Sequence, residues 1–226
     1  LKSMEASMSN YPTLFFGSHD MPRLINRLAK NNPERTEALT ALILTAKGVP
    51  FIYYGEEIGM ENIEANSLSE IKDIQGRTQY QLAINKGQSE NEALKIGNEH
   101  NRDKSRSPMQ WNSDTLAGFS SSKSWIKVNP NYTIVNVELQ EKNPESMLSK
   151  YKQLIALRNS EPVLQYGNYE SLEISKDCIY FVRTYENTKI TVIINFGKSF
   201  TVNLPDNSII LSGSPILNTN DFLIFK

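Results

Sequence analysis

The sequence predicts an α/β region up to about residue 160 and a small all-β region from residue 161 to residue 226. The first 60 residues have the pattern strand, helix, strand, whereas the residues after 160 form short runs with the two-residue period of strands. Parallel strands joined by helices occur in a doubly wound sheet or in a (β/α)8 barrel, and two such units close neither fold. We therefore expect part of a larger α/β domain followed by a β domain.

Two apolar runs near the start have the length of buried strands. Residues 12–17 end in Gly17 and are followed at once by polar Ser18-His19-Asp20. Residues 49–54 end at Gly55-Glu56-Glu57. Because active sites on parallel α/β folds collect at the carboxyl ends of the strands, these two polar segments are candidates for chemistry.

The segment between the two strands begins with a helix-start signal. Asn32 can cap the free amides, Pro33 fits the first turn, and Glu34 suits the positive end of the helix dipole. The predicted helix ends at Lys47-Gly48, a basic last turn followed by a residue that tolerates unusual backbone angles.

A long polar excursion follows, from residue 61 to about residue 125, with one predicted helix at about 68–86. Connections of this length are usually binding or lid elements, and Met109 and Trp111 favour an ordered one. Another helix is predicted from Pro144 to about Ser160. Its apolar face consists of Met147, Leu148, Tyr151, Leu154, Ile155 and Arg158.

The last part of the chain alternates in the manner of half-buried strands, most clearly at Ile190, Val192, Ile194 and Phe196. Turn residues separate the runs at Glu186-Asn187, Gly197-Lys198, Pro205-Asp206-Asn207 and Ser212-Gly213-Ser214. Five or six short strands with tight turns predict a small antiparallel sandwich.

The composition excludes partners that are recognised by charge. Lys and Arg number 24 against 25 Asp and Glu, so no overall field favours nucleic acid or a membrane surface. No run approaches the roughly 18 apolar residues of a membrane span. The single Cys178 cannot form an internal disulfide and is predicted to be a small buried thiol. We expect a cytoplasmic protein, although the first residues of a partial chain carry no information on targeting.

Three motifs in order carry a resemblance to a known family. They are Phe16-Gly-Ser-His-Asp-Met-Pro-Arg23, Gly48-Val-Pro-Phe-Ile-Tyr-Tyr-Gly-Glu-Glu-Ile-Gly-Met60 and Asn101-Arg-Asp-Lys-Ser-Arg-Ser-Pro-Met-Gln-Trp111. Together they resemble the oligo-1,6-glucosidase or α-glucosidase branch of the α-amylase family, glycoside hydrolase family 13. The resemblance implies the last two βα units of a (β/α)8 TIM barrel, with strands seven and eight at about 13–17 and 50–54. A C-terminal antiparallel β domain would follow from residue 161, and residues 61–125 would be a loop insertion in the barrel part.

The resemblance also implies roles for single residues. Asp20 would be the family's third carboxylate, which holds sugar hydroxyls and favours an oxocarbenium-like transition state, and His19 would donate a hydrogen bond beside it. Arg23 and Arg102 would be fixed cations, with Arg102 paired to an acidic residue and touching the non-reducing glucose. For Arg106 a contact with substrate and a purely structural role in the loop are equally consistent with the sequence.

Two departures from the family pattern concern specificity. Gln75 stands where many members of this branch have Glu near the leaving-group sugar, so it keeps hydrogen bonds and loses charge. Ser18 replaces the Asn that usually precedes the His-Asp pair. Glu56 and Glu57 are not assigned as acid and nucleophile, because the resemblance places those residues before Leu1. Glu56 is expected to brace its loop.

The resemblance implies a parent protein that hydrolyses terminal α-linked glucose from short oligosaccharides with retention. This chain would lack the nucleophilic Asp and the acid Glu and would be inactive alone. The alternatives are a transglucosylating or sucrose-isomerising relative, a non-catalytic relative such as the transporter-associated ectodomains, and a free carbohydrate-binding module. The intact segment His19-Asp20-Met-Pro-Arg23 argues against a non-catalytic relative.

No cofactor or metal site is expected in this chain, because His19, His100 and Cys178 lack the spacing of zinc ligands. A calcium site in the rest of the parent remains open. The expected partners are an oligosaccharide substrate and the missing N-terminal half of the barrel. Because an incomplete barrel exposes strand edges, self-association or partial disorder of residues 1 to about 60 is expected.

Overall fold

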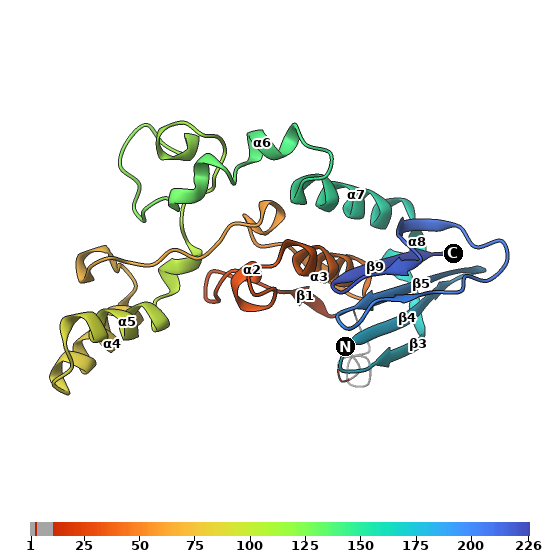
Figure 1. Cartoon of the computed structure of the whole chain (residues 1–226), viewed down its shortest axis with the longest axis horizontal. Coiled ribbons are helices and arrows are strands. Elements are labelled where there is room, and N and C mark those ends of the chain that lie inside the picture. The colour runs from red at the N-terminus through yellow and green to blue at the C-terminus, as the bar shows by residue number, and fades with distance from the viewer. Residues whose placement is uncertain (1–2, 4–10) are drawn as a thin grey trace. The chain divides into compact units, whose positions relative to one another are not determined.

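The computed structural model describes Ser3 and residues 11–226, which form two compact units (Figure 1). The first unit combines residues up to Phe15 with Asn32–Phe51 and Ser149–Lys226. The second consists of Phe16–Asn31 and Ile52–Leu148. Each unit is described by itself.

The first unit begins with a strand–helix–strand segment. Strands β1 (Thr13–Phe15) and β2 (Val49–Phe51) pair in parallel, with Thr13 opposite Val49. Parallel pairing confirms the predicted pattern, although both strands are shorter than the apolar runs that predicted them. Among the described residues, β1 and β2 pair only with each other.

Helix α3 (Pro33–Thr45) joins the two strands and begins where the sequence predicted. The side chain of Asn32 accepts a hydrogen bond of 2.6 Å from the main-chain N–H of Arg35, and Pro33 occupies the first turn. The helix ends at Thr45, slightly before the predicted end at Lys47-Gly48.

Two buried arginines satisfy the carbonyl groups beyond the end of α3. Arg158 donates to the carbonyl oxygens of Leu44 at 2.6 Å and Gly48 at 2.7 Å. Arg183 donates to the carbonyl of Thr45 at 2.6 Å and to that of Gly167 at 2.7 Å. Because the last carbonyls of a helix have no partner within it, these guanidinium groups replace a local C-terminal cap.

Arg158 comes from helix α7 (Met147–Ser160), which begins three residues after the predicted start at Pro144. Of the face predicted from its sequence, Leu148, Tyr151, Leu154 and Arg158 are buried, whereas Ile155 is exposed. A short helix α8 (Pro162–Tyr166) leads from α7 to the first antiparallel strand. The division into domains at residue 160 stays a prediction.

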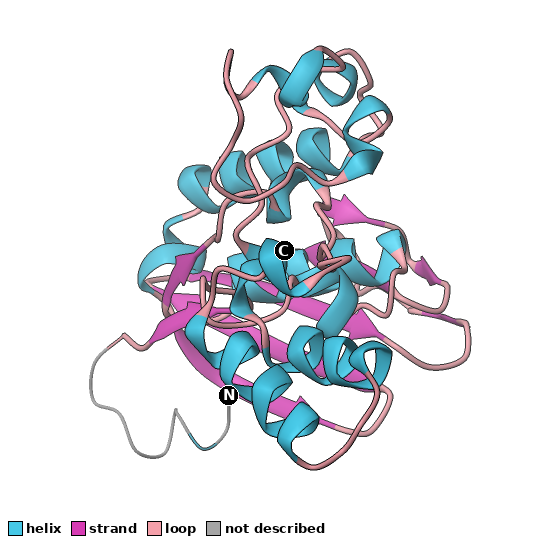
Figure 2. Ribbon diagram, turned by 90° about the vertical axis from the view of Figure 1, so that its left-hand side faces the viewer, coloured by secondary structure: helices cyan, strands magenta, loops and turns pink. Residues whose placement is uncertain are grey.

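The rest of the first unit is antiparallel sheet, as predicted (Figure 2). Five strands pair in the order β3-β4-β5-β9-β7, and two more form a small second sheet. The strands are β3 (Asn168–Ile174), β4 (Cys178–Tyr185), β5 (Thr188–Asn195), β6 (Phe200–Thr201), β7 (Ile210–Gly213), β8 (Ile216–Leu217) and β9 (Asp221–Phe225).

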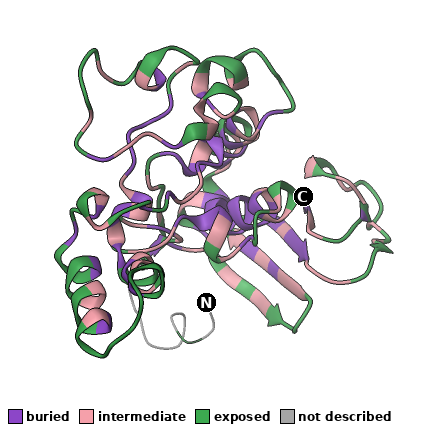
Figure 3. Ribbon diagram, turned by 60° about the vertical axis from the view of Figure 1, so that its left-hand side comes forward, coloured by how far each residue is buried: buried purple, intermediate pink, exposed green. Residues whose placement is uncertain are grey.

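Strand β5 confirms the predicted alternation. Ile190, Val192 and Ile194 are fully buried. Figure 3 draws the buried parts of the strands in purple. The opposite face of the sheet contributes Ile193 to a second core, where Cys178 packs only partly buried. Cys178 is therefore less buried than predicted, and its partial burial raises the pKa of the thiol.

The second unit holds the long excursion, which is ordered by short helices. They are α2 (Leu24–Arg27), η1 (Glu56–Ile58), η2 (Leu68–Glu70), α4 (Ile74–Asn85), α5 (Glu90–His100), η3 (Arg102–Ser105), η4 (Thr115–Gly118), η5 (Pro130–Thr133) and α6 (Val137–Glu141). A core of Ile58, Met60, Met109 and Leu148 joins distant parts of this unit. The helix predicted at 68–86 is wrong at its start, since α4 begins at Ile74, and α5 was not predicted.

Candidate functional site

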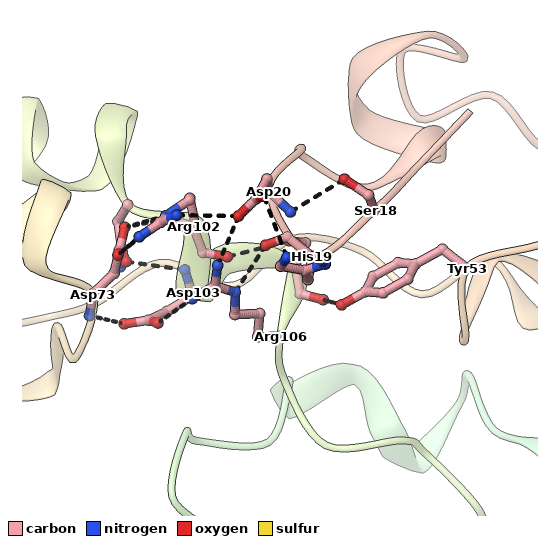
Figure 4. A network of polar contacts seen from close by, with 10 residues as sticks. Ser18, His19, Asp20, Tyr53, Asp73, Arg102, Asp103 and Arg106 are labelled. Carbon is pink, nitrogen blue, oxygen red and sulfur yellow. Dashed lines mark hydrogen bonds and ion pairs between the residues drawn. The ribbon is translucent and has the colours of Figure 1, made fainter. Parts of the chain in front are cut away.

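The second unit brings His19 and Asp20 together with two arginines of the long excursion (Figure 4). His19 and Asp20 lie in a turn that follows β1, and the main-chain N–H of Asp20 donates to the Ser18 hydroxyl at 3.2 Å. Arg102 begins the 3₁₀ helix η3, and Arg106 is its C-terminal capping residue. One tight turn of chain therefore presents both guanidinium groups to the same carboxylate.

The carboxylate of Asp20 is oriented by three neighbours. Its Oδ1 accepts from Nη1 of Arg102 at 3.1 Å and from Nη2 of Arg106 at 3.0 Å. Its Oδ2 lies 3.2 Å from Nε2 of His19. The Asp20 side chain nevertheless remains 50% exposed. A fixed carboxylate that is open on one side can accept hydrogen bonds from a polar ligand.

Asp73 binds the Arg102 guanidinium through both of its carboxylate oxygens. Nη2 of Arg102 lies 2.6 Å from Oδ1 of Asp73, and Nε lies 3.1 Å from both carboxylate oxygens. The main-chain N–H of Arg102 also donates to Asp73, at 3.0 Å. This fork geometry fixes both the position and the plane of the guanidinium group.

The Asp73–Arg102 pair shifts both pKa values towards the charged forms. Burial by itself raises the pKa of Asp73, but the hydrogen bonds and charge of Arg102 outweigh it, and the pKa lies below its usual range. The hydrogen bonds that Arg102 donates to Asp73 raise the pKa of Arg102. Both groups are therefore charged at neutral pH.

Asp103 fixes the backbone at Asp73. Its Oδ2 accepts the main-chain N–H groups of Lys72 at 2.7 Å and Asp73 at 2.9 Å. Its Oδ1 lies 4.0 Å from Nη1 of Arg106, and Nε of Arg106 donates to the carbonyl oxygen of His19 at 2.8 Å. Arg106 thus joins the cluster and is more than a loop contact.

Arg23 and Gln75, which the resemblance implied as substrate contacts, lie outside this cluster. Arg23 is 1% exposed, donates to the carbonyl oxygen of Tyr54, and lies over the rings of Tyr53 and Tyr54. Its burial lowers the pKa of the guanidinium. Arg23 is a fixed cation, as expected, but it is too deeply buried to touch a ligand. Gln75 is exposed in the first turn of α4.

Glu56 supports its loop, as the sequence suggested. Its side chain is only 4% exposed, and Oε2 accepts the main-chain N–H of Tyr53 at 3.2 Å. Burial raises the pKa of Glu56 to about 7. A Cβ atom at Gly17 would collide with Oε1 of Glu56, so a larger residue directly before Ser18-His19-Asp20 would force the Glu56 side chain to shift.

Asp73 and Asp103 were not among the predicted site residues. Asp73 stands two positions before Gln75, and Asp103 directly follows Arg102. An acidic residue next to Arg102 was the available signal for Asp103, but the separation of 29 positions between Asp73 and Arg102 hides their pairing. Within the described residues no group of three or more His, Cys, Asp and Glu side chains is arranged to hold a metal ion.

An oriented, half-exposed carboxylate that follows a strand of an α/β fold is typical of a site at which an enzyme binds a polar ligand. Sequence comparison gives the same class. Residues 1–167 match the family described as the α-amylase catalytic domain, and the chain belongs to that family.

The matching relatives share most of this chain. A probable oligo-1,6-glucosidase of Bacillus subtilis (strain 168) is 37% identical over 227 residues, which cover 95% of this chain and 40% of the relative. The trehalose-6-phosphate hydrolase of Escherichia coli (strain K12) is 33% identical over 82% of this chain and 34% of its own length. The chain thus spans 40% or less of these relatives.

The solved structure of isomaltulose synthase from Klebsiella sp. LX3 superimposes with a TM-score of 0.85 at 30% identity. The match covers 100% of this chain and 45% of that one. Such neighbours are TIM-barrel enzymes of the α-amylase family, and they confirm the predicted fold class of barrel units followed by an antiparallel β domain. Among the described residues no helix has the length and hydropathy needed to cross a membrane.

Proposed function

We propose that this chain supplies the transition-state carboxylate of a retaining α-glucosidase that removes terminal α-linked glucose from short oligosaccharides. The observation that carries the proposal is the Asp20 carboxylate, held by Arg102 and Arg106 through one oxygen and still half exposed. Its second oxygen, beside His19, is available to a sugar hydroxyl.

The chemistry follows from the charge that develops during glycosidic bond cleavage. As the anomeric carbon becomes positive, neighbouring hydroxyls become better hydrogen-bond donors, and a fixed carboxylate binds them more strongly than in the ground state. The exposed imidazole of His19 lies beside Asp20 and can add a hydrogen bond to the same sugar. Because Arg102 is fixed by Asp73, the carboxylate needs little reorganisation when the transition state forms.

The nucleophile and the general acid are proposed to lie outside these 226 residues. Glu56 and Glu57 are neighbours in sequence, but each carries an oxygen that is buried without a hydrogen-bond partner in the described part of the chain. Burial raises the pKa of both carboxyls, which suits groups in the interior of a loop. The relatives extend well beyond the segment that this chain matches.

A chimera tests this proposal. This chain replaces the matching segment of the Bacillus subtilis relative, and hydrolysis of an aryl α-glucoside is measured with and without Asp20→Asn. The substitution is expected to lower kcat by about 10²–10³ or more, without changing the melting temperature. Glu90→Gln, an exposed change in α5, serves as the matched control. Near-normal activity of the Asp20→Asn chimera would remove Asp20 from the mechanism.

The same assay applied to the 226-residue chain alone tests where the missing groups lie. No turnover is expected. Turnover that disappears with Asp20→Asn would mean that this chain, or an assembly of copies, holds a complete site.

Transfer to another sugar is the second candidate function. It is supported by the similarity to an isomaltulose synthase and by Gln75, where related hydrolases have a charged residue. The same covalent intermediate would then pass to a sugar hydroxyl instead of water. Product analysis with sucrose separates the two candidates, since a hydrolase releases glucose and fructose and an isomerising enzyme releases a new disaccharide.

A further inference from the structure

Asp103 is a buried carboxylate of the Asp20 cluster to which the proposed reaction assigns no task. Its side chain is only 4% exposed. The main-chain N–H groups of Lys72 and Asp73 donate to its Oδ2 at 2.7 and 2.9 Å, and Nη1 of Arg106 lies 4.0 Å from its Oδ1. Because hydrogen bonds and a neighbouring cation favour the ionised form of a carboxyl group, Asp103 brings a negative charge into the cluster.

A purely structural task would not need that charge. The neutral amide oxygen of an asparagine, which has the same shape as aspartate, can also accept two main-chain N–H groups. A buried charge is costly unless it is fully paired, and Oδ1 of Asp103 is buried without a hydrogen-bond partner among the described residues. A costly charge where a neutral side chain would do points to a use for the charge itself.

The charges of the cluster do not cancel. Its members are three carboxylates and two guanidinium groups, on Asp20, Asp73, Asp103, Arg102 and Arg106. One negative charge is therefore in excess, apart from His19, which is charged only when it is protonated. Without Asp103 the two arginines would balance the two remaining carboxylates, and the cluster would be neutral.

Two guanidinium groups on one carboxylate oppose a reaction that passes through a cation. Arg102 and Arg106 contact the same oxygen of Asp20, at 3.1 and 3.0 Å, and so weaken the negative potential on the open side of this carboxylate. An oxocarbenium-like transition state is stabilised by a negative potential. The charge of Asp103 offsets that of Arg106 from the buried side, where solvent screens it little.

We propose that Asp103 is a positioning residue that acts through Arg106. It neutralises the charge of this arginine, so that Arg106 orients Asp20 while the cluster as a whole stays negative and favours a cationic ligand. The inference rests on the proposed function for the reaction that uses this potential. The potential itself is a property of the cluster and has a readout of its own.

That readout is the preference of the site for a cation over a neutral ligand of similar shape. Isofagomine is a glucose-shaped amine that is protonated at neutral pH, with its nitrogen at the position of the anomeric carbon, whereas glucose is neutral. Titration calorimetry measures the binding of each compound to the chimera described above. The ratio of the two dissociation constants reports the potential at the site.

Asp103→Asn is the informative variant, because its amide oxygen can still accept both main-chain N–H groups. It is expected to weaken the binding of isofagomine about tenfold relative to glucose and to lower kcat by a similar factor, with KM nearly unchanged. Glu90→Gln removes a negative charge from the exposed start of α5 and is expected to leave the ratio unchanged. Near-ultraviolet circular dichroism shows that each variant is folded.

A double variant separates the charge of Asp103 from its place in the structure. Asp103→Asn combined with Arg106→Gln again leaves one negative charge in excess, although both native side chains are lost. The preference for isofagomine is expected to return, while kcat stays low because Arg106 no longer orients Asp20. A ratio that stays at the value of Asp103→Asn would show that Asp103 acts only through the structure.

The outcomes separate this inference from the proposed function. An unchanged ratio in Asp103→Asn, or no preference for isofagomine in the unsubstituted chimera, would overturn the inference even if Asp20→Asn inactivates the chimera. A preference that is lost in Asp103→Asn, together with an active Asp20→Asn chimera, would support the inference and reject the catalytic role of Asp20. If Asp103→Asn does not fold, Arg106→Gln alone tests the inference, since it should increase the preference, and no increase would overturn it.

Discussion

Asp73 determines where the Arg102 guanidinium points, although it does not touch Asp20. Its side chain is only 2% exposed and accepts from Arg102 through both carboxylate oxygens. Asp73→Asn keeps the shape and removes the charge. Arg102 is partly exposed and retains its ion pair with Asp20 in this variant. The free energy of unfolding is therefore expected to fall by about 1–3 kcal/mol, less than for a fully buried pair. Urea unfolding at neutral pH measures it.

The pH dependence of that loss has a definite sign. The pKa of Asp73 is lowered in the folded state, so the unfolded state binds more protons at acidic pH. The stabilisation is fully present above about pH 4 and is lost as the pH falls through the lowered pKa. The stability difference between the native chain and Asp73→Asn should therefore stay constant between pH 6 and about pH 4 and shrink as the pH falls further. A difference that stays constant down to about pH 2 would show that the charge of Asp73 is not what stabilises the cluster.

Glu56 is expected to behave in the opposite way. Burial raises its pKa to about 7, so between about pH 4.5 and 7 the folded state holds a proton that the unfolded state releases. Stability from this group is lost as the pH rises. Glu56→Gln, which keeps an acceptor for the Tyr53 N–H, should gain stability relative to the native chain between pH 5 and pH 8. An unchanged difference in unfolding free energy across this range would argue that Glu56 is ionised throughout.

The sequence named His19, Asp20 and Arg102 as candidates from three ordered motifs, and the structure places these side chains in contact. It could not show that Arg23 is buried over Tyr53 and Tyr54, since a motif gives neighbours along the chain and not contacts across it. Whether these residues act on a substrate stays a prediction.

At the level of single elements, the strength of the local signal separates the helices that were predicted from those that were missed. Helix α3 has a capping Asn, a first-turn Pro and a buried apolar face. Helix α5 has a complete capping box, in which Ser89 and Glu92 exchange hydrogen bonds, but few apolar residues follow. Hydrophobic periodicity therefore could not find it, whereas the capping box could have.

Helices α4 and α5 pack through two glycines, and this contact gives a prediction. A Cβ atom at Gly76 would lie 2.9 Å from Cβ of Asn101 and 3.1 Å from the carbonyl oxygen of Gly97. Alanine improves helix propensity by up to about 1 kcal/mol, but overpacking costs about 1–3 kcal/mol. Gly76→Ala should therefore destabilise the helix pair, as measured by thermal unfolding at 222 nm.

Thr78→Ala is the matched control, because Thr78 is exposed on the same helix. It should change stability by no more than about 0.5 kcal/mol. A gain in stability from Gly76→Ala, in line with propensity, would contradict the close packing of α4 against α5.

At the scale of the whole molecule, Arg158 connects the end of α3 to helix α7, and Arg183 connects it to strand β4 of the same unit. Arg183 is fully buried and binds carbonyl groups from two segments. Arg183→Lys keeps the charge but loses the planar fork, which leaves carbonyl oxygens without donors. The expected cost is about 2–5 kcal/mol.

Urea unfolding with amide exchange measures this effect. Faster exchange is expected in α3 and β4 together, because both lose the same partner. Lys189→Arg, at the exposed start of β5, is the control and should leave stability unchanged. Exchange that increases in β4 alone would show that α3 does not depend on the guanidinium.

Those two arginines also impose an order in time when the chain is synthesised. Thr45 precedes Arg183 by 138 residues. At about 5–20 residues per second, a ribosome needs roughly 7–28 s to add the second residue after the first. Throughout that interval the carbonyl oxygen of Thr45 lacks its native donor. The last turn of α3 is therefore expected to gain its full set of hydrogen bonds only after β4 has been synthesised.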